Sequence, residues 1–212
     1  MKYLLLDVSG TILYKPTLFD RIQGVLSDFE FSIDKSTIQY NHKILSETIK
    51  FPDRTDIEFY SYFNSELLYS LGVIPTSEIV SALFKACSYL PWEKYEDTKV
   101  LHEISIPMGI LSNFNATLEG KLNQFFGTIF KDIFVSETIG KSKPSIEFHQ
   151  YALEKINIDP KDILYIGDSF KLDFEPAVSL GISTFVIDRD GFYKNNVNVI
   201  SSLSEIKNII NK

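Results

Sequence analysis

The sequence predicts an α/β protein, in which a parallel sheet has helices on both faces and an all-helical segment is inserted after the first strand. Short apolar runs bounded by turn residues occur near the start of the chain and again in its second half. Segments with apolar residues at helical spacing separate the later runs, whereas a long interval after the first run shows helical spacing alone.

The predicted strands are five short apolar runs, each bounded by turn residues as buried strands are. They are Tyr3 to Asp7, Pro107 to Leu111, Asp132 to Val135, Ile163 to Ile166, and Thr184 to Ile187. Since helical segments connect the later runs, these strands are expected to lie parallel in one sheet.

Three helices are predicted around the later strands from apolar residues three or four positions apart. Their apolar residues are Leu118, Leu122 and Phe125 in the first, Phe148, Ala152, Leu153 and Ile156 in the second, and Phe174, Ala177 and Val178 in the third. This alternation of strands and helices is typical of an open parallel sheet.

The interval from about Tyr14 to Trp92 predicts a separate helical domain. Its helical spacing is clearest at Ile57, Tyr60, Phe63, Leu67, Leu68 and Leu71, and Gly72 is suited to end that helix. We therefore divide the chain into a core domain of residues 1–14 and 92–212 and a helical domain of residues 15–91. The many aromatic residues of the helical domain are expected to pack its core, with a pocket lining as the alternative.

Composition narrows the classes of partner. A chain of 212 residues that is 44% hydrophobic can bury a substantial core. The net charge of −7, without a cluster of basic residues, argues against a nucleic-acid partner. Cys87 is the single cysteine, which excludes an intrachain disulfide and favours a reducing, cytoplasmic setting. No stretch reaches the ~18 apolar residues of a membrane span, so we expect neither a membrane partner nor a cleaved leader.

Polar residues follow four of the predicted strands, where ligands bind in open parallel sheets. They are Asp7 after the first strand, Ser112 and Asn113 after the second, Lys143 a short loop after the third, and Gly167, Asp168 and Ser169 after the fourth, with Asp173 nearby. One such Asp alone is often a turn former or helix cap. Several charged groups at one place are costly to desolvate unless they bind each other, a metal or a ligand.

Four motifs occur in a fixed order, each after a predicted strand. They read DVSGT at 7–11, ILSN at 110–113, KP at 143–144 and IGDSFKLD at 166–173. With these motifs the chain resembles the haloacid dehalogenase-like (HAD) superfamily, whose first motif is Asp-x-Asp-x-Thr and whose core is a Rossmann-like sheet. The resemblance covers essentially the whole chain, and the inserted helices resemble the family's type 1 cap.

The resemblance implies a Mg²⁺-dependent hydrolase, most often a phosphatase, that acts on a small phosphorylated metabolite. Asp7 would attack phosphorus and form an aspartyl phosphate. Asp7, Asp168 and the backbone carbonyl of Ser9 would hold the Mg²⁺ ion. Asp173 would support the water shell of the metal or hold a lysine, and Thr11 would make a structural hydrogen bond at the turn.

The remaining motif residues would bind the phosphoryl group. By resemblance, Lys143 offsets its charge, while Ser112 and the backbone amide of Asn113 donate hydrogen bonds to its oxygens. The alternative for Lys143 is a solvated surface lysine such as Lys141, but its place before Pro144 and the order of the motifs favour the functional role.

Ser9 departs from the family pattern. In the phosphatases of this family the second Asp of the first motif protonates the leaving alcohol and later activates water. A serine hydroxyl does not titrate in the working range, so it cannot replace that acid. General acid–base help is worth ~10²- to 10⁴-fold, and its absence should slow reactions with poor leaving groups most.

Three interpretations of Ser9 remain open. In the first, the enzyme acts on activated substrates such as acyl phosphates, or it borrows an acid from the cap or the substrate. In the second, it belongs with family members that lack this Asp. In the third, it binds a phosphorylated ligand or partner without catalysis. Among the members that lack it, dehalogenases work without metal and carry a neutral residue in place of Asp168, and their carboxylate-binding Arg has only Arg21 as a formal counterpart. Phosphonatases need a cap lysine, for which Lys43 or Lys50 fits by position alone.

The three histidines show no metal-ligand spacing and are expected on surfaces or in loops.

Overall fold

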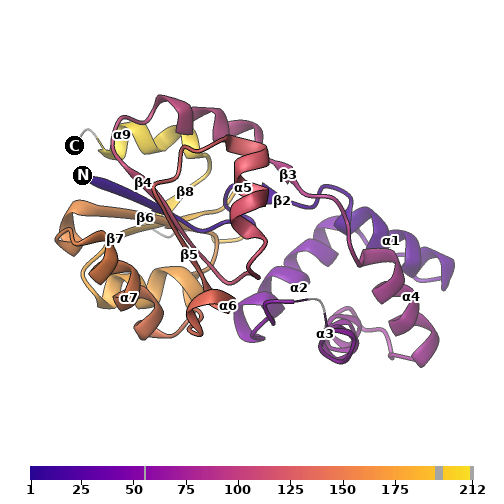
Figure 1. Ribbon diagram of the computed structural model, residues 1–212. Helices are drawn as coiled ribbons and strands as arrows, with labels where there is room; N and C mark the ends of the chain where they lie inside the picture. Colours follow the sequence, from indigo (N-terminus) through magenta and orange to yellow (C-terminus); the bar gives the residue numbers. More distant parts are fainter. Residues whose placement is uncertain (55, 194–197, 211–212) are drawn as a thin grey trace. The chain divides into compact units, whose positions relative to one another are not determined.

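The computed structural model (Figure 1) describes residues 1–54, 56–193 and 198–210. Its main feature is a sheet of six parallel strands in the order β5-β4-β1-β6-β7-β8. The strands are β1 (Tyr3–Leu6), β4 (Met108–Ser112), β5 (Asp132–Val135), β6 (Ile163–Gly167), β7 (Ser183–Ile187) and β8 (Val199–Ile200). The predicted parallel α/β fold is therefore confirmed. The sequence did not indicate β8, because two apolar residues do not form a recognisable run.

Strand β1 lies in the middle of the sheet and has long-range partners on both sides. Leu4 is in register with Met108 of β4 on one side and with Leu164 of β6 on the other. The chain builds the β4 and β5 side first and then crosses to β6, so the strand order reverses at β1. Ligands of open parallel sheets bind at such a reversal, beyond the carboxyl ends of the strands.

Helices follow most of these strands. They are α5 (Leu118–Phe126), α6 (Ser136–Ile139), α7 (Ile146–Ile156), α8 (Glu175–Ser179) and α9 (Ile206–Ile210), with short 3₁₀ helices η1 (Glu96–Glu103), η2 (Pro160–Asp162) and η4 (Leu203–Glu205) and a single π-type turn η3 (Phe170–Phe174). The three predicted helices are confirmed, with two differences in detail. Phe126 rather than Phe125 is buried in α5, and Val178 of α8 is exposed.

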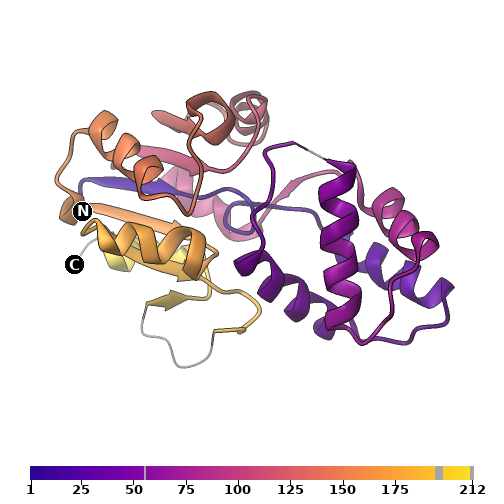
Figure 2. The same ribbon diagram turned by 90° about the horizontal axis from the view of Figure 1, so that it is seen from below.

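The core of the sheet follows from alternation along β1. Tyr3 and Leu5 pack with residues of α7 such as Phe148 and Ala152, whereas Leu4 and Leu6 face the opposite side. Figures 1 and 2 show helices on both sides of the sheet, with α7 on one and α9 on the other. Burial of a large apolar side chain contributes about 1.5–3 kcal/mol, so this core holds the strand ends firmly.

The described residues of the inserted segment form four helices, α1 (Leu18–Asp28), α2 (Lys35–Thr48), α3 (Ile57–Ser70) and α4 (Ser77–Cys87). They share a core that includes Ile22, Leu26, Ile38, Leu67, Leu68 and Leu83. Gly72 ends α3 with φ +76°, and the amide of Val73 donates to Leu68 O, as in a Schellman cap. Phe63 is buried as expected, but Ile57 lies exposed at the start of α3.

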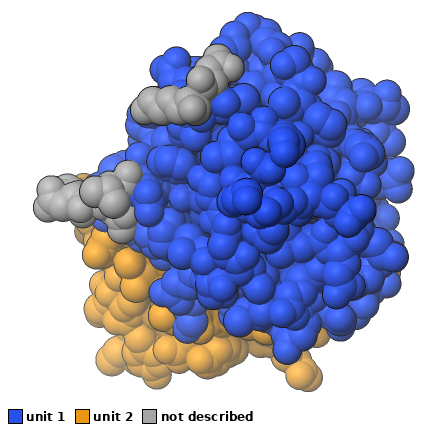
Figure 3. All heavy atoms as spheres, turned by 90° about the vertical axis from the view of Figure 1, so that its left-hand side faces the viewer, with its two compact units in different colours: residues 1–14, 94–212 blue, residues 15–93 orange. Residues whose placement is uncertain are grey.

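The chain forms two compact units (Figure 3). The sheet unit comprises Met1–Tyr14 and Lys94–Lys212, and the helical unit comprises Lys15–Glu93. Strands β2 (Leu13–Tyr14) and β3 (Glu93–Lys94), where the chain passes between the units, pair as a two-stranded sheet. Over the described parts of both units, no helix has the length and apolar character to cross a membrane.

Candidate active site

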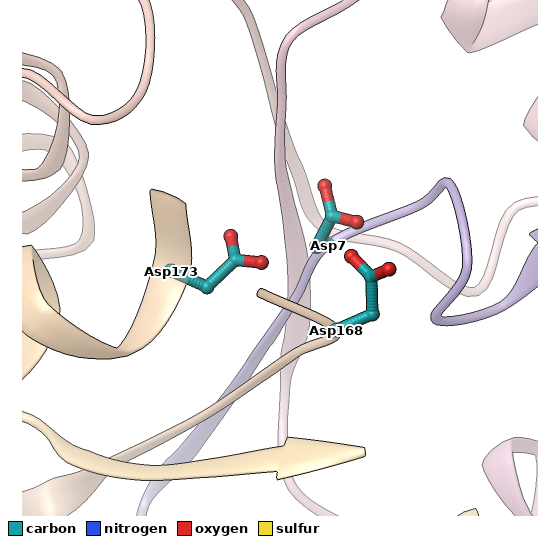
Figure 4. A group of neighbouring side chains, drawn as sticks. All are labelled: Asp7, Asp168 and Asp173. Atoms are coloured by element: carbon teal, nitrogen blue, oxygen red, sulfur yellow. The ribbon is translucent and has the colours of Figure 1, made fainter. Parts of the chain in front are cut away.

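Three carboxylates meet beyond the carboxyl ends of β1 and β6. Asp7 directly follows β1, Asp168 directly follows β6, and Asp173 lies in the turn η3. One oxygen of each carboxylate lies within 4.8 Å of the others (Figure 4). Asp7 and Asp173 are buried and Asp168 is half-buried. The apolar strand β1 therefore ends by delivering a carboxylate into an acidic cluster that two other segments complete.

Lys143 joins this cluster from the loop before α7. Its Nζ lies 2.6 Å from Asp7 Oδ1 and 2.6 Å from Asp173 Oδ1. Only 3% of Lys143 is exposed, whereas Lys141 is exposed, so Lys143 is not a surface lysine. Burial alone would lower the pKa of Lys143, but the carboxylates of Asp173 and Asp7 outweigh it and raise that pKa. The ammonium group therefore stays charged.

Asp7 receives a donor at each oxygen. Lys143 Nζ and Ser112 Oγ, which is 3.2 Å away, donate to Oδ1, and Thr11 Oγ1 donates to Oδ2 at 3.3 Å. Burial raises the pKa of Asp7 to about 6; Lys143 opposes this rise, and the negative charges of Asp173 and Asp168 add to it. The cluster thus holds more negative charge than its lysine can neutralise.

Asp173 has both oxygens engaged by the protein. Tyr165 Oη donates to Oδ1 at 2.6 Å, next to the lysine contact, and the amide of Ser169 donates to Oδ2 at 3.1 Å. Burial disfavours the charged form, but Lys143 and these hydrogen bonds outweigh it and hold the pKa of Asp173 below its usual range. Asp173 is thus placed to orient Lys143.

The donor set fits a hard divalent cation. Three carboxylates and one ammonium group leave two negative charges when all are ionised, which one divalent ion would balance. Such ions take oxygen ligands, and Mg²⁺ usually takes one or two carboxylates and keeps several waters. Asp7 Oδ2 and the half-buried Asp168 are the carboxylate groups best placed to serve.

Two glycines allow the carboxylates to approach the backbone closely. A Cβ at Gly10 would lie 2.4 Å from Oδ2 of Asp168, and Gly10 has φ +79°. A Cβ at Gly167 would lie 2.3 Å from Cγ of Asp173. Real Cβ atoms do not tolerate such distances, so each position requires glycine as long as the carboxylates stay in place.

Ser9 and Asn113, the residues beside the cluster, differ in exposure and in the contacts that they make. Ser9 is exposed, and its backbone forms an isolated bridge with Leu13. Asn113 uses its side chain to hold the loop of Lys143: Nδ2 donates to Lys143 O at 2.9 Å, and Oδ1 accepts from Lys143 N at 2.7 Å. The structure thus brings all predicted site residues to one edge of the sheet.

Sequence reasoning missed Tyr165 and the side-chain role of Asn113. Tyr165 lies in β6 two residues before Gly167, so strand alternation places it on the same side as the glycine that contacts Asp173. That alternation was the available signal. No comparable signal indicated that the Asn113 carboxamide would bind a backbone 30 residues away.

The expectation of surface or loop histidines is wrong for His149. This residue lies buried in α7, with its ring 5.8 Å from that of Tyr165. Burial, followed by the positive charge of Lys143, lowers the pKa of His149 to about 4. In α2 of the helical unit, burial also lowers the pKa of His42 to about 4. Within the described ranges, the three-carboxylate cluster is the one candidate metal group, and it contains no histidine.

Residues 17–187 match the model of the haloacid dehalogenase-like hydrolase family. The match spans more than half of the chain, and the chain therefore belongs to this family. The fold and the order of the four motifs agree with that assignment.

The relatives of this chain include proteins named as phosphatases and as dehalogenases. The chain is 33% identical over 87 residues to glyceraldehyde 3-phosphate phosphatase of Methanocaldococcus jannaschii. This alignment covers 38% of this chain and 38% of that phosphatase, well under two thirds of the length of the relative. The magnesium-bound structure of HAD-hydrolase YfnB from Bacillus subtilis has a TM-score of 0.67 at 22% identity and covers 100% of this chain and 99% of its own. The L-2-haloacid dehalogenase RSc1362 has a TM-score of 0.66 at 15% identity, with 100% and 99% covered. At these identities the two structures show a common fold.

Proposed function

We propose that this hydrolase is a Mg²⁺-dependent phosphatase that acts on a small phosphorylated metabolite through an aspartyl phosphate at Asp7. The observation that carries the proposal is the buried contact of Lys143 with Asp7 beside Asp168 and Asp173. Dehalogenation at a carbon centre has no need of this surplus of carboxylates, whereas phosphoryl transfer uses a cation that they would bind.

Asp7 is the proposed nucleophile. One of its oxygens attacks phosphorus while the bond from phosphorus to the leaving oxygen breaks, and the leaving group departs with that electron pair. Water then attacks the phosphorus of the aspartyl phosphate, which releases inorganic phosphate and restores the Asp7 carboxylate. Ser112 and Thr11 donate to the two oxygens of Asp7 and hold it in one orientation.

Asp7, Asp168 and the backbone carbonyl of Ser9 would hold Mg²⁺. When bound, the ion would neutralise the approach of an anionic phosphate to an anionic carboxylate. Asp173 would act indirectly, since its two oxygens already accept hydrogen bonds from Lys143, Tyr165 and the Ser169 amide.

Lys143, Ser112 and the amide of Asn113 are the proposed partners of the transferring phosphoryl group. The fixed charge of Lys143 costs no reorganisation during the reaction, because two carboxylates and the Asn113 carboxamide already hold the residue in place. Positioning and electrostatics supply most of the catalysis that phosphoryl transfer requires.

Ser9 sets the proposed substrate class. Without a titratable group at this position, a leaving group that needs a proton would depart slowly. We infer that the preferred substrates have acidic leaving groups, as acyl phosphates do. The helical unit would serve as the cap and supply the contacts that select among them.

The alternative from a different class is a HAD-like protein that binds Mg²⁺ or phosphate without turnover, for which the serine at position 9 is the supporting observation. A metal-free 2-haloacid dehalogenase is a further alternative, supported by the similarity in fold to RSc1362. Arg21, the formal counterpart of the carboxylate-binding Arg, is exposed on α1.

The test is hydrolysis of an aryl phosphate with an acidic leaving group, with Mg²⁺ and with a chelator, by the natural protein and by Asp7→Asn. The proposal predicts turnover that needs both Mg²⁺ and Asp7. Turnover of a 2-haloacid in the presence of chelator would indicate the dehalogenase instead. Mg²⁺ binding without turnover of either substrate would indicate the binding protein.

A further inference from the structure

Arg189, two residues after the end of β7, contacts the backbone of the loop that follows β1. Its Nη1 donates to Gly10 O at 3.0 Å, and its Nη2 donates to Thr11 O at 2.9 Å. Two consecutive carbonyls are thereby held by one planar group. The guanidinium fork is suited to this role because its donors have a fixed geometry.

The guanidinium is itself held from two other directions. Asp97 of η1 accepts from Nε at 3.0 Å and from Nη2 at 2.9 Å, in a bidentate ion pair. The ring of Tyr95 lies 3.7 Å from the guanidinium carbon and stacks on Tyr14 at a centroid distance of 4.3 Å. Asp97 in turn accepts from the amide of Leu203 at 3.0 Å. Arg189 therefore has little freedom to move.

The loop held by Arg189 carries three parts of the acidic site. Thr11 donates to Asp7, Gly10 lies against the carboxylate of Asp168, and the carbonyl of Ser9 is the proposed backbone ligand. The turn also closes on itself, because the amides of Gly10 and Leu13 bond to Leu13 O and Val8 O. The orientation of its peptide groups thus decides whether these parts face one point.

We propose that Arg189 is a positioning residue that holds the loop of residues 8–13 in the shape required for cation binding beside Asp7. This inference rests on the proposed function for its metal but concerns Arg189, which none of the four motifs includes. Arg189 lies in the sheet unit with all of its partners, and its hydrogen bonds go to the loop and to Asp97 rather than to the three carboxylates of the cluster.

The first test is calorimetric titration of Mg²⁺ into the natural protein, Arg189→Ala and Arg189→Lys. Outer-shell partners of metal ligands typically contribute 10–100-fold in affinity, so we expect Arg189→Ala to weaken binding by ~10-fold or more. Arg189→Lys keeps a positive charge near Asp97 but cannot serve both carbonyls and the carboxylate, so it should restore affinity only in part. Full affinity in a folded Arg189→Ala protein would overturn the proposal.

Lys207→Ala is the matched control. Lys207 of α9 pairs with Glu103 of η1, so this variant removes another ion pair of η1 in the same unit. The ion pair of Lys207 with Glu103 does not involve the loop of residues 8–13. The Mg²⁺ affinity of Lys207→Ala should therefore equal that of the natural protein. An equal loss of affinity in both variants would point to a general effect of η1 and would contradict the specific role of Arg189.

Hydrogen exchange of the peptide that contains residues 8–13 separates this inference from the proposed function. Its amides are bonded within the turn, so release of the carbonyls in Arg189→Ala should speed their exchange without added metal. If the natural protein binds no Mg²⁺, the proposed function fails, and exchange alone then decides the positioning role. Unchanged exchange in this peptide would overturn that role in either case.

Discussion

At the scale of single residues, position 9 carries serine where the phosphatase motif that this chain resembles carries its second Asp. An acid at this place would act twice, once on the leaving group and once on the attacking water. Ser9 can do neither, because its hydroxyl does not titrate near neutral pH. The proposed mechanism therefore slows in both halves. In the second half the leaving group is the Asp7 carboxylate, which needs no proton, so the missing contribution there is activation of the attacking water.

Ser9→Asp should raise the hydrolysis of alkyl phosphates, because it restores a titratable group beside the nucleophile. The gain should approach the ~10²- to 10⁴-fold typical of general acid–base catalysis only if the new carboxylate reaches the leaving oxygen. Steady-state kinetics with alkyl and aryl phosphates would measure it, and the alkyl substrates should gain more. No gain in a folded variant would mean that the missing acid is not the limiting defect.

Asn113→Ala tests whether the loop of Lys143 needs its side-chain clamp. The substitution removes the two hydrogen bonds to the Lys143 backbone, and a displaced catalytic group can cost up to ~10²-fold. We expect kcat on an aryl phosphate to fall about tenfold or more. Asn115→Ala is the control, since Asn115 accepts from Thr117 at the start of α5. Equal kcat values for the two variants would refute the clamp.

At the scale of elements, the site is assembled by the ends of strands β1, β4 and β6 and the loops that follow them, together with the loop before α7 that carries Lys143. The strands are rigid because their side chains are buried in the core, so each motif residue starts from a fixed point. The loops are shaped by contacts that close on the carboxylates, of which the glycine contacts are the tightest.

Gly167→Ala should disrupt the site, because its Cβ would overlap the Asp173 carboxylate 2.3 Å away. Overpacking of this kind typically costs 1–3 kcal/mol, and here it would also displace the partner of Lys143. Thermal unfolding and aryl phosphatase assays should both show a loss. Gly120→Ala, in α5 with no atom near its Cβ, should instead gain about 0.5–1 kcal/mol. A Gly167→Ala protein as stable and active as the natural one would contradict the close approach.

The sequence predicted five of the six sheet strands and the helices that follow them, because both depend on local apolar spacing. It could not predict β8, which is two residues long and exists only through its pairing with β7. The motif residues were found from their positions after strands. Arg189 and the Asn113 carboxamide act through contacts between residues far apart in the chain, and such contacts leave no local pattern. Tyr165 contacts Asp173 eight residues away, and alternation along the strand was the signal that could have indicated it.

At the scale of the whole molecule, each unit holds a histidine with a lowered pKa, of which His149 is buried and His42 is half-buried. The ring of His149 contacts that of Tyr165 in the sheet unit, and the ring of His42 contacts those of Phe19 and Phe63 in the helical unit. Burial comes first among the causes that lower the pKa of each to about 4 from an ordinary value of 6.5. The unfolded chain therefore binds more protons than the folded chain between these pH values.

The free energy of unfolding should fall as pH drops from about 6.5 towards 4. Each histidine with a lowered pKa contributes its full stabilisation above pH 6.5. Below that pH the contribution falls by about 1.4 kcal/mol per pH unit, which amounts to about 3 kcal/mol for each histidine by pH 4. The free energy of unfolding, measured with denaturant at several pH values in this range, should depend less steeply on pH in His149→Phe than in the natural protein. His102→Phe, at an exposed site on η1, is the control variant. An unchanged slope in His149→Phe would mean that His149 is not held neutral.

The central claim is that Asp7 accepts a phosphoryl group, and trapping that group on the protein tests it most directly. The protein would be mixed with acetyl phosphate and Mg²⁺, quenched in acid and examined by peptide mass spectrometry, with Asp7→Asn as the control. Since Ser9 cannot activate water, the account predicts that the aspartyl phosphate accumulates on the peptide with Asp7 and decays faster in Ser9→Asp. A natural protein that hydrolyses the donor without phosphate on Asp7, or that never reacts with it, would contradict the account.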